Sequence, residues 1–226
     1  MFKFHVFKLI GRIILLVFAI ILYIQDQLNF SQFKLERPLT LSGAFLIVVW
    51  VTLVIGMLGR IIPNKFVTTG AGKHFKKPQL SLTKESLSHQ GVIAIAIVWF
   101  VLNVSVILLL LHLNLLNIGI ALIISLVYSI CDVSFILFFC PFQKLFMFNK
   151  CCATCRIYNW DFFMACTPLI PFIHMYSTSL VLLSVIVLVR WEVAVYKKSY
   201  FITSDCMACK DKMCYAKRRL HKTRGA

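Results

Sequence analysis

The residues whose spacing best suits chemistry are cysteines arranged in two C-x-x-C pairs. The sequence contains nine cysteines, and the pairs read C-A-T-C over residues 152–155 and C-M-A-C over residues 206–209. Two sulfurs at this spacing can chelate one metal ion, as in four-thiolate zinc and iron–sulfur sites. Further cysteines lie close to both pairs along the chain. The sequence therefore predicts a zinc ion or an iron–sulfur cluster, held by thiolates from the set Cys140, Cys151, Cys152, Cys155, Cys206, Cys209 and Cys214.

The separation of the two pairs leaves other interpretations open. Fifty residues lie between Cys155 and Cys206, whereas the pairs of a zinc site are usually about 15 to 20 residues apart. Two membrane helices that form a hairpin between the pairs would return them to one membrane face. The alternatives are thiol–disulfide exchange, and lipidated or inert free thiols, because juxtamembrane cysteines beside basic residues also suit palmitoylation.

The elements that position these cysteines are membrane helices. The chain has 226 residues, 60% of them hydrophobic and 14% charged, with a mean hydropathy of +0.87. One crossing of a bilayer needs about 20 apolar residues, and the rest of the chain is too short for a separate soluble catalytic domain. We expect an all-α, polytopic integral membrane protein with a basic, cysteine-containing tail at 196–226. The predicted spans are 7–24, 41–58, 91–111, 118–139, 157–173 and 177–195.

The distribution of charge predicts how these spans are oriented. The net charge is +16, and the basic residues lie mostly between the apolar runs, where they face anionic lipid headgroups; the lipid bilayer, not nucleic acid, is the predicted partner. Six crossings with the N-terminus inside place 22 Lys and Arg on the inner side and 2 on the outer side, whereas five crossings place 12 on each. Basic residues favour the cytoplasmic side. We therefore predict six crossings in the cell membrane with both termini cytosolic.

The fifth of these spans is the weakest, because two prolines interrupt it. Pro168 and Pro171 fall within residues 157–173, and each proline removes a backbone donor for which the surroundings must compensate. A re-entrant hairpin is the alternative geometry for this segment.

Asp132 is the polar residue of most interest inside a predicted span. It lies about 10 Å from the inner end of the fourth span at 1.5 Å per residue. Intramembrane carboxyl groups are functional candidates by default, but Asp132 would also serve as a packing contact to Asn103 or Ser105 of the third span. Asp161 is interpreted as a charge at a helix N-terminus.

The histidines and the rest of the sequence give weaker signals. His112 and His174 lie at predicted helix ends, where they could ligate haem but are more typical of solvated interface residues. We recognise no Ser/His/Asp triad and no pair of catalytic carboxylates, so enzymatic activity stays open. The leading hypothesis is an integral membrane redox or metal-binding protein with a cytosolic-face cysteine cluster. The alternative is a non-enzymatic transporter, or a subunit that binds other membrane proteins, with structural zinc or free thiols.

Overall fold

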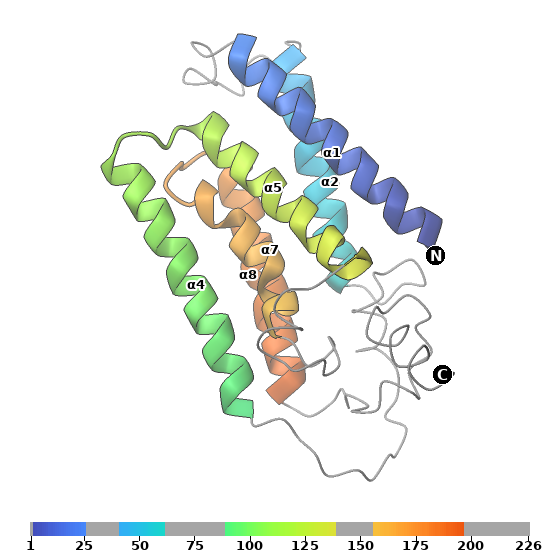
Figure 1. The fold of residues 1–226 in the computed structure, drawn as a ribbon, viewed down its shortest axis with the longest axis vertical. Helices are drawn as coiled ribbons and strands as arrows, with labels where there is room; N and C mark the ends of the chain where they lie inside the picture. The colour runs from blue at the N-terminus through green and yellow to red at the C-terminus, as the bar shows by residue number, and fades with distance from the viewer. Residues whose placement is uncertain (1, 26–40, 62–88, 139–155, 197–226) are drawn as a thin grey trace, which may run out of the picture.

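The fold is built from α-helices. The computed structural model describes residues 2–25, 41–61, 89–138 and 156–196, and within these ranges all regular structure is helical (Figure 1). The all-α prediction is confirmed. The elements are α1 (Phe2–Gln25), α2 (Leu41–Ile61), α4 (His89–His112), α5 (Ile118–Leu137), α7 (Arg156–Cys166), the 3₁₀ helix η3 (Thr167–Leu169) and α8 (Met175–Tyr196).

Four of these helices contain stretches that are long and apolar enough to cross a membrane. These stretches are Val6–Gln25 in α1, Leu41–Ile61 in α2, Ile118–Phe135 in α5 and Met175–Val193 in α8. Helix α4 adds a shorter apolar stretch, Ala96–His112. Large aliphatic side chains are exposed on the outer faces of these helices, as expected where lipid replaces water; examples are Ile14, Ile55, Leu108 and Leu182. The protein therefore associates with a lipid bilayer.

The predicted fifth span does not form one long helix. Helix α7 has 11 residues and continues into η3, which has 3 residues and contains Pro168 in its first turn. Pro168 lacks a backbone donor, so the α-helix ends where it does. Together α7 and η3 rise roughly 22 Å, which is less than the ~30 Å thickness of a bilayer core.

The helices pack into one bundle around an apolar core. Helix α1 lies along α5, α2 packs against α8, and α7 and α8 form an antiparallel pair that α4 and α5 flank (Figure 1). The core between α2, α5 and α8 is fully buried, and its central residues are Val49, Met57, Leu122, Leu126 and Leu180.

A tight connection joins the end of α4 to the start of α5. Asn114 adopts a left-handed backbone conformation with φ of 54°, and the Leu110 carbonyl accepts hydrogen bonds from the next two backbone amides. Asn117 then caps α5, because its side chain accepts a hydrogen bond of 2.9 Å from the Ile120 backbone N–H. Both features are typical of helix ends. The chain therefore turns between the predicted third and fourth spans, with α4 ending at His112 and α5 beginning at Ile118.

The same connection holds the C-terminal end of α1. Asn117 donates a hydrogen bond of 3.0 Å to the hydroxyl oxygen of Tyr23, and the Tyr23 ring lies directly on Gly119. A Cβ atom at position 119 would be 2.6 Å from Cδ2 of Tyr23, so only glycine admits the ring in this position.

We predict that Gly119→Ala destabilises the protein by about 1–3 kcal/mol, the usual cost of overpacking, because the Tyr23 ring must move and lose its bond to Asn117. Gly11→Ala is the matched control, since nothing lies within 4 Å of a Cβ atom there. Thermal unfolding of both purified variants in detergent measures the effect. A melting temperature for Gly119→Ala equal to that of Gly11→Ala would contradict the prediction.

Candidate functional site

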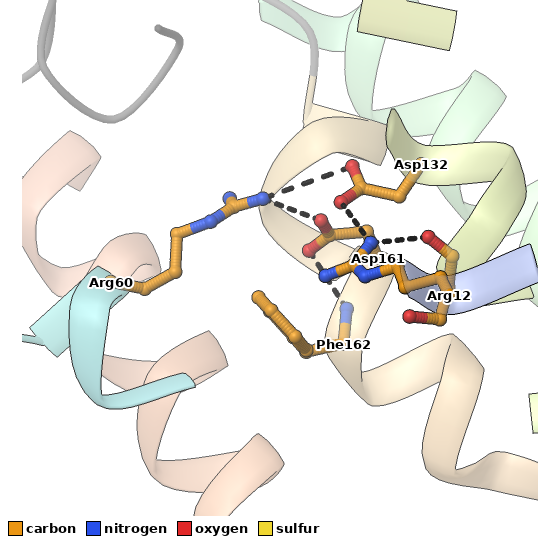
Figure 2. Close-up of polar contacts among 6 residues, drawn as sticks. Arg12, Arg60, Asp132, Asp161 and Phe162 are labelled. Carbon is orange, nitrogen blue, oxygen red and sulfur yellow. Dashed lines mark hydrogen bonds and ion pairs between the residues drawn. The ribbon is translucent and has the colours of Figure 1, made fainter. Parts of the chain in front are cut away.

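Four charged side chains from four different helices meet inside the bundle. Arg12 comes from α1, Arg60 from α2, Asp132 from α5 and Asp161 from α7, and Figure 2 shows them pointing toward one another. Their side chains are only 9%, 2%, 11% and 13% exposed, in that order. We call these four residues the charged network.

Arg60 links the two carboxylates of the network. Its Nη2 atom lies 2.6 Å from Oδ2 of Asp161 and 3.9 Å from Oδ1 of Asp132. Arg12 approaches from the other side, with Nη1 3.7 Å from Oδ2 of Asp132, and it also donates a hydrogen bond to the backbone carbonyl of Ser129. The same Arg60 nitrogen thus lies within 4 Å of both carboxyl groups. Each carboxylate therefore has an arginine partner and a carboxyl neighbour.

The network forms because several helix ends meet at one end of the bundle. Arg60 is the last residue but one of α2, Asp132 lies five residues before the end of α5, and Asp161 is the sixth residue of α7. Arg12 lies well inside α1, which runs along α5. We call this the network end of the bundle.

An aromatic ring and a glycine shape the space around Arg60. The guanidinium carbon of Arg60 lies 5.2 Å from the centre of the Phe162 ring, a cation–π contact. The edge of that ring faces Gly56 of α2, where a Cβ atom would be 3.1 Å from Cζ of Phe162. Gly56 therefore lets α7 approach α2 closely enough for Arg60 to reach Asp161.

Because the four side chains are buried, losing one of these contacts would be costly. An unpaired charge inside a membrane protein costs several kcal/mol, so intramembrane ionisable residues are paired and face the bundle interior. The network obeys this rule with two arginines and two carboxylates. Lys8, half-buried on α1, lies close enough for the charges of Arg12, Arg60 and Asp132 to act on it. This end of the bundle is therefore strongly polar although it lies among apolar helices.

Asn103 belongs to a separate set of polar contacts. It accepts a hydrogen bond of 2.6 Å from the Tyr128 hydroxyl and donates one of 3.4 Å to the Met164 carbonyl, which joins α4, α5 and α7. The sequence left open a packing contact between Asp132 and Asn103, and the structure pairs Asp132 with the arginines instead. Neither of the predicted alternatives for Asp132 included a cation.

The prediction for Asp161 is wrong in its detail. Helix α7 begins at Arg156, so Asp161 lies in the second turn and not at the N-terminus. The pairing of the two carboxylates was not predicted from the sequence, in which Arg12 and Arg60 served only as markers of topology. One signal was present, because Arg12 is embedded in an apolar run where an unpaired cation would be costly.

The predicted metal ligands lie outside the described residues. All seven of Cys140, Cys151, Cys152, Cys155, Cys206, Cys209 and Cys214 fall in the undescribed segments 139–155 and 197–226, so the metal site stays a prediction. Cys131 and Cys166 are described and both are free thiols. His112 ends α4 and His174 precedes α8. Among the described residues, no group of three or more His, Cys, Asp or Glu side chains could hold a metal ion.

No protein-family model, no curated protein and no solved structure matches the chain. The charged network and the cysteine pairs are therefore the features from which a function can be inferred. The charged network is observed in the structure, whereas the cysteine pairs are known from the sequence alone.

We predict that Asp161→Asn destabilises the protein by about 3–5 kcal/mol, the usual cost of breaking a buried ion pair from one side. Arg60 would keep its charge but lose its 2.6 Å partner. Asp132→Asn removes only the longer contacts and should cost less. The double variant Arg60→Met/Asp161→Leu should recover most of the loss, because no charge is then left unpaired.

Unfolding of the four proteins in detergent, followed by helix content, checks this order. An Asp161→Asn variant as stable as Asp132→Asn would show that the short Arg60–Asp161 pair does not contribute more to stability than the longer pairs.

Proposed function

We propose that the protein is a non-enzymatic membrane transport protein whose charged network closes the inner end of the helical bundle. The observation that carries this proposal is the convergence of four buried ionisable side chains from four helices. Ionisable residues inside membrane proteins are expensive and typically mark ion or substrate pathways. A purely structural role is a weaker explanation, because well-packed apolar residues hold helices together without the desolvation cost of buried charges.

The connectivity of the network suits a gate. Arg12 joins α1 to α5, and Arg60 joins α2 to both α5 and α7. These helices can separate at this end only when the ion pairs break. Two of the three pairs are long, at 3.7 and 3.9 Å, and long pairs exchange partners at low cost. A charged solute would compete for the same arginines or carboxylates as it passes.

We further propose six crossings with both termini on the inner side of the cell membrane. The helix ends support this arrangement: α2 and α5 end at the network, where α7 begins. Trp160 of α7 donates a hydrogen bond of 3.0 Å to Glu192 near the end of α8, and its ring contacts Phe100 in the first half of α4. The ends that the charge count assigns to the inner side are thus neighbours.

The short fifth segment is compatible with this topology. Helices α7 and α8 form a hairpin that begins and ends at the same end of the bundle. If α7 and η3 cross the bilayer as a bent segment and α8 crosses back, the C-terminal tail returns to the proposed inner side.

A second candidate function is metal binding or redox chemistry, and the two C-x-x-C pairs favour it. The first pair, at residues 152–155, comes just before α7 in the sequence, and the second pair, at residues 206–209, comes after α8. The start of α7 and the end of α8 are adjacent in the structure. A zinc site would tie the tail to the α5–α7 connection of the transport protein. An iron–sulfur cluster would add electron transfer.

Transport is tested by reconstituting the protein in liposomes on a solid-supported membrane and recording current after concentration jumps. The probes are inorganic anions, inorganic cations, small carboxylates and amino acids. We expect charge movement with at least one class, and its loss in the folded Arg60→Met/Asp161→Leu variant. Folded protein that gives no current with any class, or a variant that behaves as wild type, would contradict a transport role for the network.

Metal binding is tested by elemental analysis and an absorption spectrum of anaerobically purified protein. We expect zinc, or iron with acid-labile sulfide, and its loss when Cys152, Cys155, Cys206 and Cys209 are changed to serine. Changing Cys131 and Cys166 to serine is the matched control, because both are free thiols within the helices. Protein that contains no metal would end the metal hypothesis.

A further inference from the structure

The two carboxylates of the charged network are held in very different ways. Both oxygens of Asp161 accept direct hydrogen bonds, 2.6 Å from Nη2 of Arg60 and 2.7 Å from the Phe162 backbone nitrogen. The carboxylate oxygens of Asp132 lie 3.7 Å from Nη1 of Arg12 and 3.9 Å from Nη2 of Arg60. Both distances exceed the ~2.7–3.2 Å of an N–H···O hydrogen bond. Protonation of Asp161 would therefore break direct hydrogen bonds, whereas protonation of Asp132 would break none to the arginines.

Burial and the neighbouring cations act in opposite directions on the carboxyl group of Asp132. The side chain is 11% exposed, and burial disfavours the charged form of a carboxyl group, whereas nearby cations favour it. The cations lie just outside hydrogen-bond distance, so they compensate the charge without fixing its position. A modest displacement of either arginine would weaken the contacts that favour the charged form.

A protonated Asp132 would also have a hydrogen-bond acceptor in place. An ionised carboxylate can only accept hydrogen bonds, whereas a protonated one can donate. The carboxyl group of Asp161 binds the same Arg60 nitrogen that lies 3.9 Å from Asp132, and it is held in position by Arg60 and by its own backbone contact. The neutral form of Asp132 would therefore have a carboxylate beside it.

The charged and titratable groups that face Asp132 come from every helix that contributes to this site. Arginine does not lose its charge in proteins, so the two guanidinium groups act as fixed cations and Asp132 is the more weakly held of the two acids. The groups are Lys8 and Arg12 on α1, Arg60 on α2, Asp161 on α7 and the adjacent thiol Cys131 on α5 itself.

We propose that Asp132 binds a proton from water at the inner face and that this event releases Arg12 from its carboxylate partner. One O–H bond forms on Asp132, and that group donates to Asp161. Among the described residues, Arg12 then keeps only its hydrogen bond to the Ser129 carbonyl. This inference rests on the proposed transport function and names the proton as the ion coupled to it.

Release of Arg12 connects proton binding to helix movement. A buried guanidinium without a carboxylate is costly, and the long arginine side chain can carry its charge toward the interface. Arg12 provides an ionic contact between α1 and α5, so the neutral state of Asp132 weakens the attachment of α1 at this end. Protonation thus opens the gate on the α1 side while Arg60 keeps α2 attached to α7.

Infrared difference spectroscopy of the purified protein tests this proposal as pH is stepped downward. We expect the C=O band of a protonated carboxyl group to develop reversibly, to be lost in Asp132→Asn and to be restored in Asp132→Glu. Glu192→Gln is the matched control and should keep the band, because Glu192 accepts a hydrogen bond from Trp160 of α7. Arg12→Met should move the band to higher pH, because removal of a cation favours the neutral acid.

Several results would overturn the proposal. They are a wild-type protein without such a band, a band that survives in a folded Asp132→Asn variant, and a band whose pH dependence does not change in Arg12→Met. The measurement needs no solute and no flux. A protein with the expected band but no transport current would therefore contradict the proposed function alone, and a current without the band would contradict the proton site alone.

Discussion

The burial of Arg60 is the constraint on which the network end of the bundle depends. Its side chain is 2% exposed, and a guanidinium cannot be made neutral to relieve the cost of burial. Carboxylates must therefore come to it, which brings the last turns of α5 and the second turn of α7 against the end of α2. Gly56 and Phe162 follow from the same constraint, because one leaves space between α2 and α7 and the other covers the guanidinium face.

Polar contacts of this kind carry unusual weight in a membrane protein. Lipid tails are as apolar as leucine side chains, so apolar contact alone does little to select which helices pair. Here each of several helix pairs has a specific polar contact. Trp50 of α2 donates to Ser179 of α8 at 2.9 Å, Tyr128 of α5 donates to Asn103 of α4, and Asn117 donates to Tyr23 of α1. Packing then closes around these contacts wherever a glycine leaves room, as Gly119 does for Tyr23.

The unequal environments of the two carboxylates give the network both stability and exchange. Asp161 and Arg60 form a short, fully bonded pair that resembles a structural element, whereas Asp132 stands between two arginines without a close contact to either. A site composed only of short ion pairs would be rigid. A site composed only of long ion pairs would not offset the desolvation cost of burying four charges. This difference suits the proposed gate, in which α2 and α7 stay joined while α1 and α5 part.

The sequence by itself determined that the helices are surrounded by lipid, that the fold is all-α and where most helices lie. Apolar runs of bilayer length have few other structures available to them. The sequence also indicated the α4–α5 turn and the interruption at Pro168, where local backbone chemistry decides. Asp132 could be singled out for the same reason, as an acid within an apolar run. The partners of Asp132 were decided only by the tertiary structure, because Arg12, Arg60 and Asp161 are distant in sequence and pair according to helix packing. A single sequence encodes the cost of each buried charge, but which charges meet depends on the crossing and depth of four helices.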